Sequence, residues 1–153
     1  MKIKIISIGN KSPNWVQESI QNYTARLNNY FPIDWIQIKP EKKFSTIEIK
    51  KSSEAKNILN YIDKDFVICL EESGLQGTSK KLAENLTKWK ESHSSIAFII
   101  GGSDGLSKKI LELSGFNLSL SKMTLPHQLV KIILIEQIFR ANSINTNHPY
   151  HRE

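Results

Sequence analysis

A fully apolar run passes directly into a glycine-rich turn at residues 96–105, which read Ile96-Ala97-Phe98-Ile99-Ile100-Gly101-Gly102-Ser103-Asp104-Gly105. Five apolar residues in succession are typical of a strand that helices cover on both faces, as in a parallel sheet. A second run of this kind occupies Phe66–Leu70 and leads into a polar loop at 72–77. Two buried strands, each ending in a polar or glycine-rich loop, predict an α/β fold.

Strand-like and helix-like segments alternate outward from these two runs. Strand formers dominate residues 2–8, 33–38 and 117–120, and apolar residues recur at helical spacing over 13–30, 46–63, 78–92, 106–114 and 126–144. Ser12 is the expected N-cap of the first helix, and Thr78 with Ser79 that of the third. No repeat or linker interrupts the alternation. We therefore expect one domain over residues 1–153, a three-layer α/β sandwich with a mostly parallel sheet.

The last predicted helix carries more apolar residues than one core-facing stripe requires. Residues 129–139 read Leu-Val-Lys-Ile-Ile-Leu-Ile-Glu-Gln-Ile-Phe, which places apolar side chains around most of the helix. Two arrangements would cover a second apolar face: a deeply internal helix, or an isologous contact in a homodimer. We favour the homodimer.

Ligands of parallel α/β sheets bind beyond the carboxyl ends of the strands, so the loops after Leu70, Ile100 and Leu120 are the candidate binding segments. The middle loop holds three glycines, which allow close backbone approach to a ligand or a positive φ angle. Asp104 in this loop is a candidate N-cap for the helix that follows. The glycine spacing matches neither the dinucleotide fingerprint nor a Walker motif. The glycine loop therefore either binds a different kind of ligand or is a tight structural turn.

The chain ends in an unusual concentration of reactive side chains. Asn147-His148-Pro149-Tyr150-His151-Arg152-Glu153 brings two imidazoles, a phenol and a guanidinium into seven residues. This set suits phosphate contacts, base stacking and proton transfer; a solvated basic end is the alternative. We expect no metal site, because no cysteine stands near His148 and His151.

Other reactive residues are few. Cys69 lies inside the apolar run 66–70, where a small buried thiol is expected. His93 stands at a predicted helix end, where its interaction with the helix dipole accounts for it. His127 follows Pro126 at the start of the last helix, at the ligand-binding edge of the sheet, and is a candidate functional residue. No spacing predicts a Ser-His-Asp set, a Cys-His pair or paired carboxylates, which disfavours a hydrolase.

The composition is that of an ordinary globular protein. Hydrophobic residues make up 39% and charged residues 24% of the 153 residues, which excludes disorder and collagen-like repeats. The net charge of +6 comes from eighteen Lys and three Arg against fifteen acidic residues. This excess invites a polyanion such as RNA, although the chain is also rich in Ile and Asn and genome composition alone gives such a profile.

The compartment follows from what the sequence does not contain. The single cysteine argues against a disulfide framework, and no run reaches the ~20 apolar residues that a membrane span needs. Residues 1–8 alternate charge with isoleucine, unlike a signal peptide. We expect a cytoplasmic protein with no membrane partner.

Four motifs carry a resemblance to a known family. They are Phe98–Gly105, Leu118–Leu129, Glu136–Ala141 and His148–Glu153. Together they closely resemble the RlmH family, the bacterial pseudouridine N3-methyltransferases of large-subunit ribosomal RNA in the SPOUT superfamily. The resemblance covers the whole chain in length and element order. One departure is Ser103, where the family usually carries proline after the paired glycines, and this change is expected to loosen the turn slightly.

The resemblance implies a SPOUT fold whose C-terminal half forms a deep trefoil knot, although un-knotted chains are the usual expectation. It also implies a homodimer that uses S-adenosylmethionine, with the tail of one subunit completing the site of the other. By similarity, backbone groups of the same three loops would hold the cofactor. The residues assigned to it in this way are Leu70, Gly101, Gly102, Gly105, Leu120, Ser121, Lys122, Met123, Thr124, Leu125 and Pro126.

The substrate that the resemblance implies is a pseudouridine of 23S ribosomal RNA, within the 70S ribosome or the large subunit. Its N3 is mostly protonated at neutral pH, so methyl transfer needs a base or an anion-stabilising group beside it. We assign charge stabilisation or phosphate binding to Arg152, proton acceptance to His151, and stacking or hydrogen bonding to Tyr150; the sequence leaves open which of Tyr150 and His151 takes the proton. His127 and His148 join Tyr150 and Arg152 as RNA-contacting residues.

Two other classes of protein fit parts of this pattern. A non-catalytic RNA- or ribosome-binding protein would use the basic surface and would need no cofactor cavity. A small nucleotide-dependent enzyme would hold phosphates with the glycine loop and would prefer a nucleotide to S-adenosylmethionine. Binding of S-adenosylmethionine in preference to ATP and NAD therefore separates the three classes.

Overall fold

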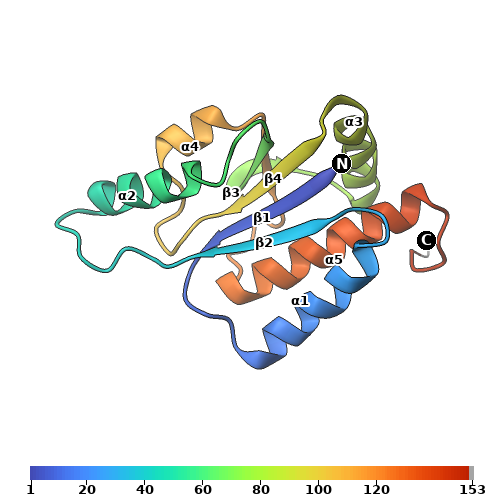
Figure 1. Ribbon diagram of the computed structural model, residues 1–153, viewed down its shortest axis with the longest axis horizontal. Helices are drawn as coiled ribbons and strands as arrows, with labels where there is room; N and C mark the ends of the chain where they lie inside the picture. The colour runs from blue at the N-terminus through green and yellow to red at the C-terminus, as the bar shows by residue number, and fades with distance from the viewer. Residues whose placement is uncertain (152–153) are drawn as a thin grey trace.

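The computed structural model describes residues 1–151 as a central five-stranded sheet with helices on both faces (Figure 1). The order across the sheet is β2-β1-β4-β3-β5, and every strand pair in the described chain is parallel. The strands are β1 (Lys2–Ile8), β2 (Ile33–Ile38), β3 (Phe66–Gln76), β4 (Ser95–Ile100) and β5 (Phe116–Ser119). The predicted α/β class is confirmed, and the sheet is parallel throughout.

Two groups of helices cover the two faces of this sheet. One group is α1 (Asn14–Leu27), α3 (Ser79–Ser92) and α5 (His127–Asn145); the other is α2 (Ile47–Leu59) and α4 (Lys108–Leu113). β4 contributes to both cores, because successive side chains of a strand point to opposite faces. Phe98 packs under the first group and Ile99 under the second, each fully buried. The three predicted layers are therefore present.

Hydroxyl caps begin three of the helices. Thr46, Thr78 and Ser107 each accept a backbone N–H from three residues further on, which satisfies a donor that a helix start leaves unpaired. The capping role predicted for Thr78 is confirmed. The role predicted for Ser12 is wrong, because Pro13 holds the N-cap position of α1 without a side-chain cap. The Ser12 hydroxyl instead accepts a hydrogen bond from the Lys131 ammonium at 3.1 Å.

β3 continues through most of the segment that was predicted as a loop. Its pairing with β5 shifts register, so that Leu70 and Leu75 both lie opposite Leu118. Gly74 stands in this irregular stretch, where a Cβ atom would lie 2.8 Å from the backbone carbonyl of Asn117. The outer part of β3 is polar and half-exposed or exposed, so it lacks the apolar pattern by which strands are predicted.

α5 packs against both α1 and α3. Leu134, Ile135 and Ile138 are fully buried there, and the Phe139 ring lies 5.9 Å from that of Tyr23 on α1. An internal helix therefore accounts for most of the apolar residues of α5. Apolar surface is left exposed only toward its first turns in the described chain, in the neighbourhood of the candidate site.

Candidate functional site

A cavity of about 380 Å³ lies at the carboxyl ends of β3, β4 and β5, which is the ligand-binding edge of a parallel sheet. Its volume is in the range of small-molecule sites. The three predicted binding loops meet here. The lining residues are Leu70, Glu71, Glu72, Ile100, Gly101, Gly102, Ser103, Gly105, Leu118, Ser119, Leu120, Ser121, Met123, Thr124, Leu125, His127 and Val130.

Most of the residues predicted for the cofactor line this cavity. The exceptions are Lys122, which is exposed, and Pro126, which is exposed at the N-cap position of α5. Both belong to the loop whose other members border the cavity. The structure therefore brings the set together in space, and its contact with a cofactor stays a prediction.

The glycine loop is a tight turn closed between Gly102 and Gly105. The Gly105 N–H donates to the Gly102 carbonyl at 3.1 Å, and the φ angle of Gly105 is +74°, where glycine is favoured. The predicted capping role of Asp104 is wrong, because α4 begins later and Ser107 caps it. Asp104 forms an ion pair with Lys50 of α2 instead, at 2.5 Å.

Ser121 organises the loop that follows β5. Its carbonyl accepts a hydrogen bond from the Ser119 hydroxyl at 3.0 Å, and its own hydroxyl accepts one from the Met123 N–H at 2.9 Å. Met123 borders the cavity and is still 75% exposed. The loop thus has a fixed backbone and an exposed apolar side chain.

Two carboxylates in the cavity wall, those of Glu71 and Glu72, are not among the residues predicted from the sequence. Both follow Leu70 directly in β3, so their place at the carboxyl end of a buried strand was the signal that could have found them. Negative charge beside a cavity favours a ligand that carries positive charge.

His127 packs into the cavity wall at the start of α5. A Cβ atom on Gly9 would lie 2.9 Å from its Cε1 atom, so the imidazole lies tightly against the end of β1. Burial lowers the pKa of His127, and the positive charge of Lys131 lowers it further. The ring is therefore mostly neutral at pH 7. The backbone of Gly101 and Ile8 lies close enough to oppose this lowering of the pKa in part, and the Nε2 atom is buried without a well-formed hydrogen bond within residues 1–151.

Lys131 is a buried cation that the sequence pattern did not single out. It is 1% exposed, and burial lowers its pKa. Its ammonium group donates to the Ser12 hydroxyl, as described above. Lys131 follows His127 by about one turn of α5 and so helps to keep that imidazole neutral.

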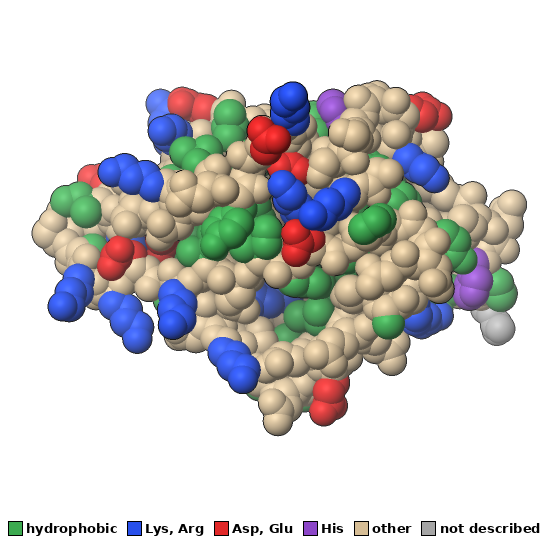
Figure 2. Space-filling model, in the orientation of Figure 1, with side chains coloured by type: hydrophobic (Ala, Val, Ile, Leu, Met, Phe, Trp, Pro, Cys, Tyr) green, Lys and Arg blue, Asp and Glu red, His purple; other side chains and the backbone are tan. Residues whose placement is uncertain are grey.

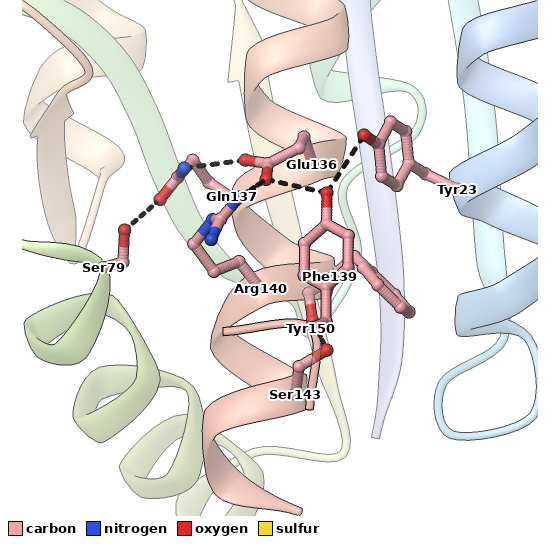
Figure 3. A network of polar contacts seen from close by, with 8 residues as sticks. All are labelled: Tyr23, Ser79, Glu136, Gln137, Phe139, Arg140, Ser143 and Tyr150. Carbon is pink, nitrogen blue, oxygen red and sulfur yellow. Dashed lines mark hydrogen bonds and ion pairs between the residues drawn. The ribbon is translucent and has the colours of Figure 1, made fainter. Parts of the chain in front are cut away.

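The C-terminal tail folds back onto α5 and α1 of its own chain (Figure 3). The Tyr150 hydroxyl donates to the Glu136 carboxylate at 3.1 Å, which leaves Tyr23 as the donor in the 3.2 Å contact between the two phenols. Arg140 pairs with the same carboxylate at 2.5 Å, and its guanidinium lies 4.8 Å from the centre of the Tyr150 ring. Burial raises the pKa of Tyr150, and its contacts with Tyr23 and Glu136 raise it further. The phenol is therefore no base in this arrangement.

Tyr150 and His151, two of the three predicted catalytic residues, lie apart from the predicted cofactor residues within one chain. Neither Tyr150 nor His151 is among the residues that line the cavity. The His148 backbone N–H donates to the Ser143 carbonyl at 2.8 Å, and the His151 Nδ1 atom is buried without a hydrogen-bond partner among the described residues. Arg152 lies outside the described residues.

Other chemistries find little support in the described chain. Residues 1–151 hold no group of three or more His, Cys, Asp or Glu side chains placed to bind a metal ion. Burial raises the pKa of the Cys69 thiol to about 11, which makes it a poor nucleophile. Within the same residues, the helices are too short or too polar to cross a bilayer.

Comparison with known proteins identifies relatives over the full length of the chain. A family model described as "Predicted SPOUT methyltransferase" matches residues 1–151. A protein of Methylobacillus flagellatus named Ribosomal RNA large subunit methyltransferase H is 39% identical, with 100% of both chains covered. Proteins of the same name from Chromobacterium violaceum and Neisseria gonorrhoeae are 40% and 37% identical, again with 100% of both chains covered. This chain therefore belongs to the SPOUT methyltransferase family.

Proposed function

We propose that this chain is an S-adenosylmethionine-dependent methyltransferase of 23S ribosomal RNA that methylates N3 of a pseudouridine, position 1915 in the family's description. One observation carries the proposal. A cavity of cofactor size lies at the carboxyl ends of β3, β4 and β5, in a chain 37–40% identical to proteins named Ribosomal RNA large subunit methyltransferase H.

The cavity wall suits S-adenosylmethionine, which supplies an electrophilic methyl group on a sulfonium cation when it is bound. Glu71 and Glu72 offer negative charge to a cationic ligand, and Leu118 offers apolar surface. A Cβ atom on Gly101 would lie 3.0 Å from the Gly105 carbonyl carbon, so glycine keeps this part of the loop compact. The described lining contains no Lys or Arg, which disfavours a nucleotide with its phosphates.

The chain's own residues would orient the RNA base and take the N3 proton. Tyr150 holds its own proton firmly, so we assign proton acceptance to His151 and stacking or hydrogen bonding to Tyr150. The His151 Nδ1 atom has no hydrogen-bond partner in the described chain, so no contact there occupies this nitrogen. Arg152 is assigned to charge stabilisation or to a phosphate.

We infer that the active unit is a homodimer in which the tail of one subunit reaches the cavity of the other. The separation of the tail from the cavity of its own chain supports this inference. Exposed apolar side chains close to the cavity support it too, since Leu75, Met123 and Leu129 are 66%, 75% and 38% exposed. A second hollow of about 490 Å³, lined in part by Leu75 and Ile133, adds surface that a partner would cover.

The basic surface supports an RNA substrate within the 70S ribosome or the large subunit. Figure 2 shows Lys and Arg side chains spread over the face in view, several of them along the edge near α2 and the segment before it. Such charge favours phosphate contacts. We assign His127 and His148 to RNA contacts as well. We propose that residues 1–153 form a single domain and that the protein acts in the cytoplasm, where ribosomes are found.

Calorimetric titration with S-adenosylmethionine, beside ATP and NAD, tests the cofactor assignment. We expect heat from S-adenosylmethionine alone, at no more than one site per subunit. Gly101→Ala should weaken this binding because its Cβ atom would meet the Gly105 backbone, whereas Gly77→Ala, which meets only the Lys81 side chain, should not. Transfer of a tritiated methyl group to ribosomes is the second assay. If none of the three ligands gives heat, the protein is an RNA-binding relative that has lost the methyltransferase activity.

A further inference from the structure

Lys50 of α2 contacts the tip of the glycine loop. Its ammonium group lies 2.5 Å from the Asp104 carboxylate and 3.3 Å from the Ser103 hydroxyl. The Ser103 hydroxyl in turn donates to the same carboxylate at 3.2 Å. The Lys50 side chain is 8% exposed and the Asp104 side chain 29% exposed, so the ammonium group is shielded from water although Ser103 and part of the carboxylate face solvent.

The contacted residues are part of the cavity's own turn. Ser103 and Asp104 form the tip between Gly102 and Gly105, whose backbones close the turn. Ser103 and both of these glycines line the cavity, whereas Lys50 does not. Lys50 therefore contacts the loop that forms the cavity wall from the side facing away from the cavity.

The turn needs an anchor of this kind. Three of the five residues from 101 to 105 are glycine, and glycine loses more conformational freedom on ordering than any other residue. Leu106 is 3% exposed and fixes one end of the loop in the core. The tip itself carries two polar side chains, so a polar partner is what can hold it.

α2 offers the loop a second contact one turn further on. The Glu54 carboxylate is buried and accepts a hydrogen bond from the Glu41 N–H at 3.2 Å. A Cβ atom on Gly102 would lie 3.6 Å from this carboxylate. α2 thus sets a cation against the loop tip and a carboxylate against its base. The Ser103 hydroxyl makes a contact with Lys50 that proline, the usual residue in the family by the resemblance above, could not make.

We propose that Lys50 is a positioning residue for the cofactor-binding loop. By holding Ser103 and Asp104 from α2, it keeps the turn in the shape that forms the cavity wall and so sets the affinity for S-adenosylmethionine. The effect on affinity rests on the proposed function. The hold on the turn does not, and it can be measured on the protein without any ligand.

The test compares Lys50→Met with Lys56→Met. Both variants lose one positive charge from α2 and keep an aliphatic side chain, but Lys56 is exposed. In the unliganded protein, Lys50→Met should raise amide hydrogen exchange at residues 102–106 by about tenfold, with exchange in β4 unchanged, because only the loop opens. Lys56→Met should match the wild type, and Lys50→Arg should restore most of the protection.

The cofactor arm uses calorimetry and steady-state kinetics on the same variants. Lys50→Met should raise the Kd for S-adenosylmethionine by about fivefold or more and raise its KM, with kcat at saturation nearly unchanged. Asp104→Asn should raise the Kd to a similar extent. The Kd of the double variant should be no higher than that of whichever single variant binds S-adenosylmethionine less tightly, because both changes break the same contact.

Each outcome decides one step. Unchanged exchange at 102–106 in Lys50→Met overturns the hold on the turn. Faster exchange with an unchanged Kd overturns the link to the cofactor. A wild-type protein that gives no heat with S-adenosylmethionine overturns the proposed function, and the exchange measurement still decides whether Lys50 holds the turn.

Discussion

Two basic side chains, the half-buried His127 and the buried Lys131, stand about one turn apart on α5 beside the cavity. Burial lowers the pKa of both, so the folded protein disfavours their charged forms relative to the unfolded chain. The only partner of the Lys131 ammonium in the described hydrogen bonds is the Ser12 hydroxyl. This pairing of an imidazole with a buried cation makes the cavity wall sensitive to pH.

Stability should fall as the pH drops below neutrality, with His127 as one cause. Its folded-state pKa lies below the ordinary value of 6.5, so between those two values the unfolded chain binds more protons than the folded one. The contribution of His127 to the free energy of unfolding is therefore present above about pH 6.5 and is lost as the pH falls from there through the folded-state pKa. Urea unfolding between about pH 5 and pH 8 measures this pH dependence. His127→Gln should flatten it; a variant as steep as the wild type would contradict the assignment.

Alanine at Tyr150, His151 or Arg152 should abolish methyl transfer to ribosomes and leave cofactor affinity within about twofold of the wild type. Tyr150 and His151 do not line the cavity of their own chain, and the tail that a partner would supply is assigned to the RNA base, so cofactor affinity should not depend on them. Calorimetry and tritium transfer on the same preparations separate the two effects. Equal loss of binding and transfer would show that the tail supports the cofactor.

Sequence reasoning reached most of the cavity because its loops follow buried strands, and strand ends can be read from apolar runs. It passed over Glu71 and Glu72, although both directly follow a buried strand. It missed Lys131 and Lys50 for a physical reason: each is a common charged residue whose burial or neighbours depend on contacts across the fold, as in the contact of Lys50 with Asp104. Local pattern carries no trace of such contacts.

At the scale of elements, β3 and β5 form the least regular pair of the sheet. The shift between Leu70 and Leu75 lets β3 border the cavity with Glu71 and Glu72 and then resume pairing. β5 leads directly into the loop that Ser121 organises. The shape of the cavity therefore depends on how closely these two strands approach.

Gly74→Ala should destabilise the protein and weaken cofactor binding. Its Cβ atom would lie 2.8 Å from the Asn117 backbone, so β5 would have to move, at a cost of about 1–3 kcal/mol in the free energy of unfolding. Gly77→Ala is the matched control, because its Cβ atom would approach no backbone atom and would lie 3.3 Å from the Lys81 Cβ atom, a milder contact. Chemical unfolding and calorimetry measure both quantities. Equal stability of the two variants would show that β3 tolerates the added methyl group.

The element order could be predicted because apolar runs and helical spacing are local signals, and the structure confirms it. The ends of the elements are harder to predict from sequence. Ser12 and Asp104 have the chemistry of N-caps, but tertiary partners, Lys131 and Lys50, bind them instead. The polar end of β3 gave no strand signal because its pairing with β5 is what makes it a strand.

At the scale of the whole molecule, the predicted cofactor cavity and the described part of the tail, with Tyr150 and His151, lie apart within one chain. The tail stays with Tyr23 and Glu136 of its own subunit, and the cavity lies at the far end of α5, beside exposed Leu129. A homodimer would bring a tail to each cavity. The trefoil knot that the family resemblance implies stays a prediction.

Mixing two inactive variants should restore methyl transfer if the site is shared. His151→Ala removes the proposed tail function, and Gly101→Ala the proposed cofactor function. A heterodimer of the two would contain one cavity and one tail that are both intact, so activity should return after subunit exchange. Leu129→Glu, a change of an exposed residue, should yield a folded monomer that fails to complement, as sedimentation would show. No recovery from a proven heterodimer would place cavity and tail of one chain in the same site.

The position of β4 between β1 and β3 has a consequence for how this protein is made. β4 follows both neighbours in the chain, so during synthesis the β1–β2 pair and β3 cannot join until Ser95–Ile100 has emerged. Parallel strands with long connections also assemble slowly, because distant segments must meet first. The nascent chain before Ser95 thus exposes unpaired strand edges, which are templates for aggregation. The arrival of β4 closes the edges of β1 and β3 that face it, and the other edge of β3 stays open until β5 follows.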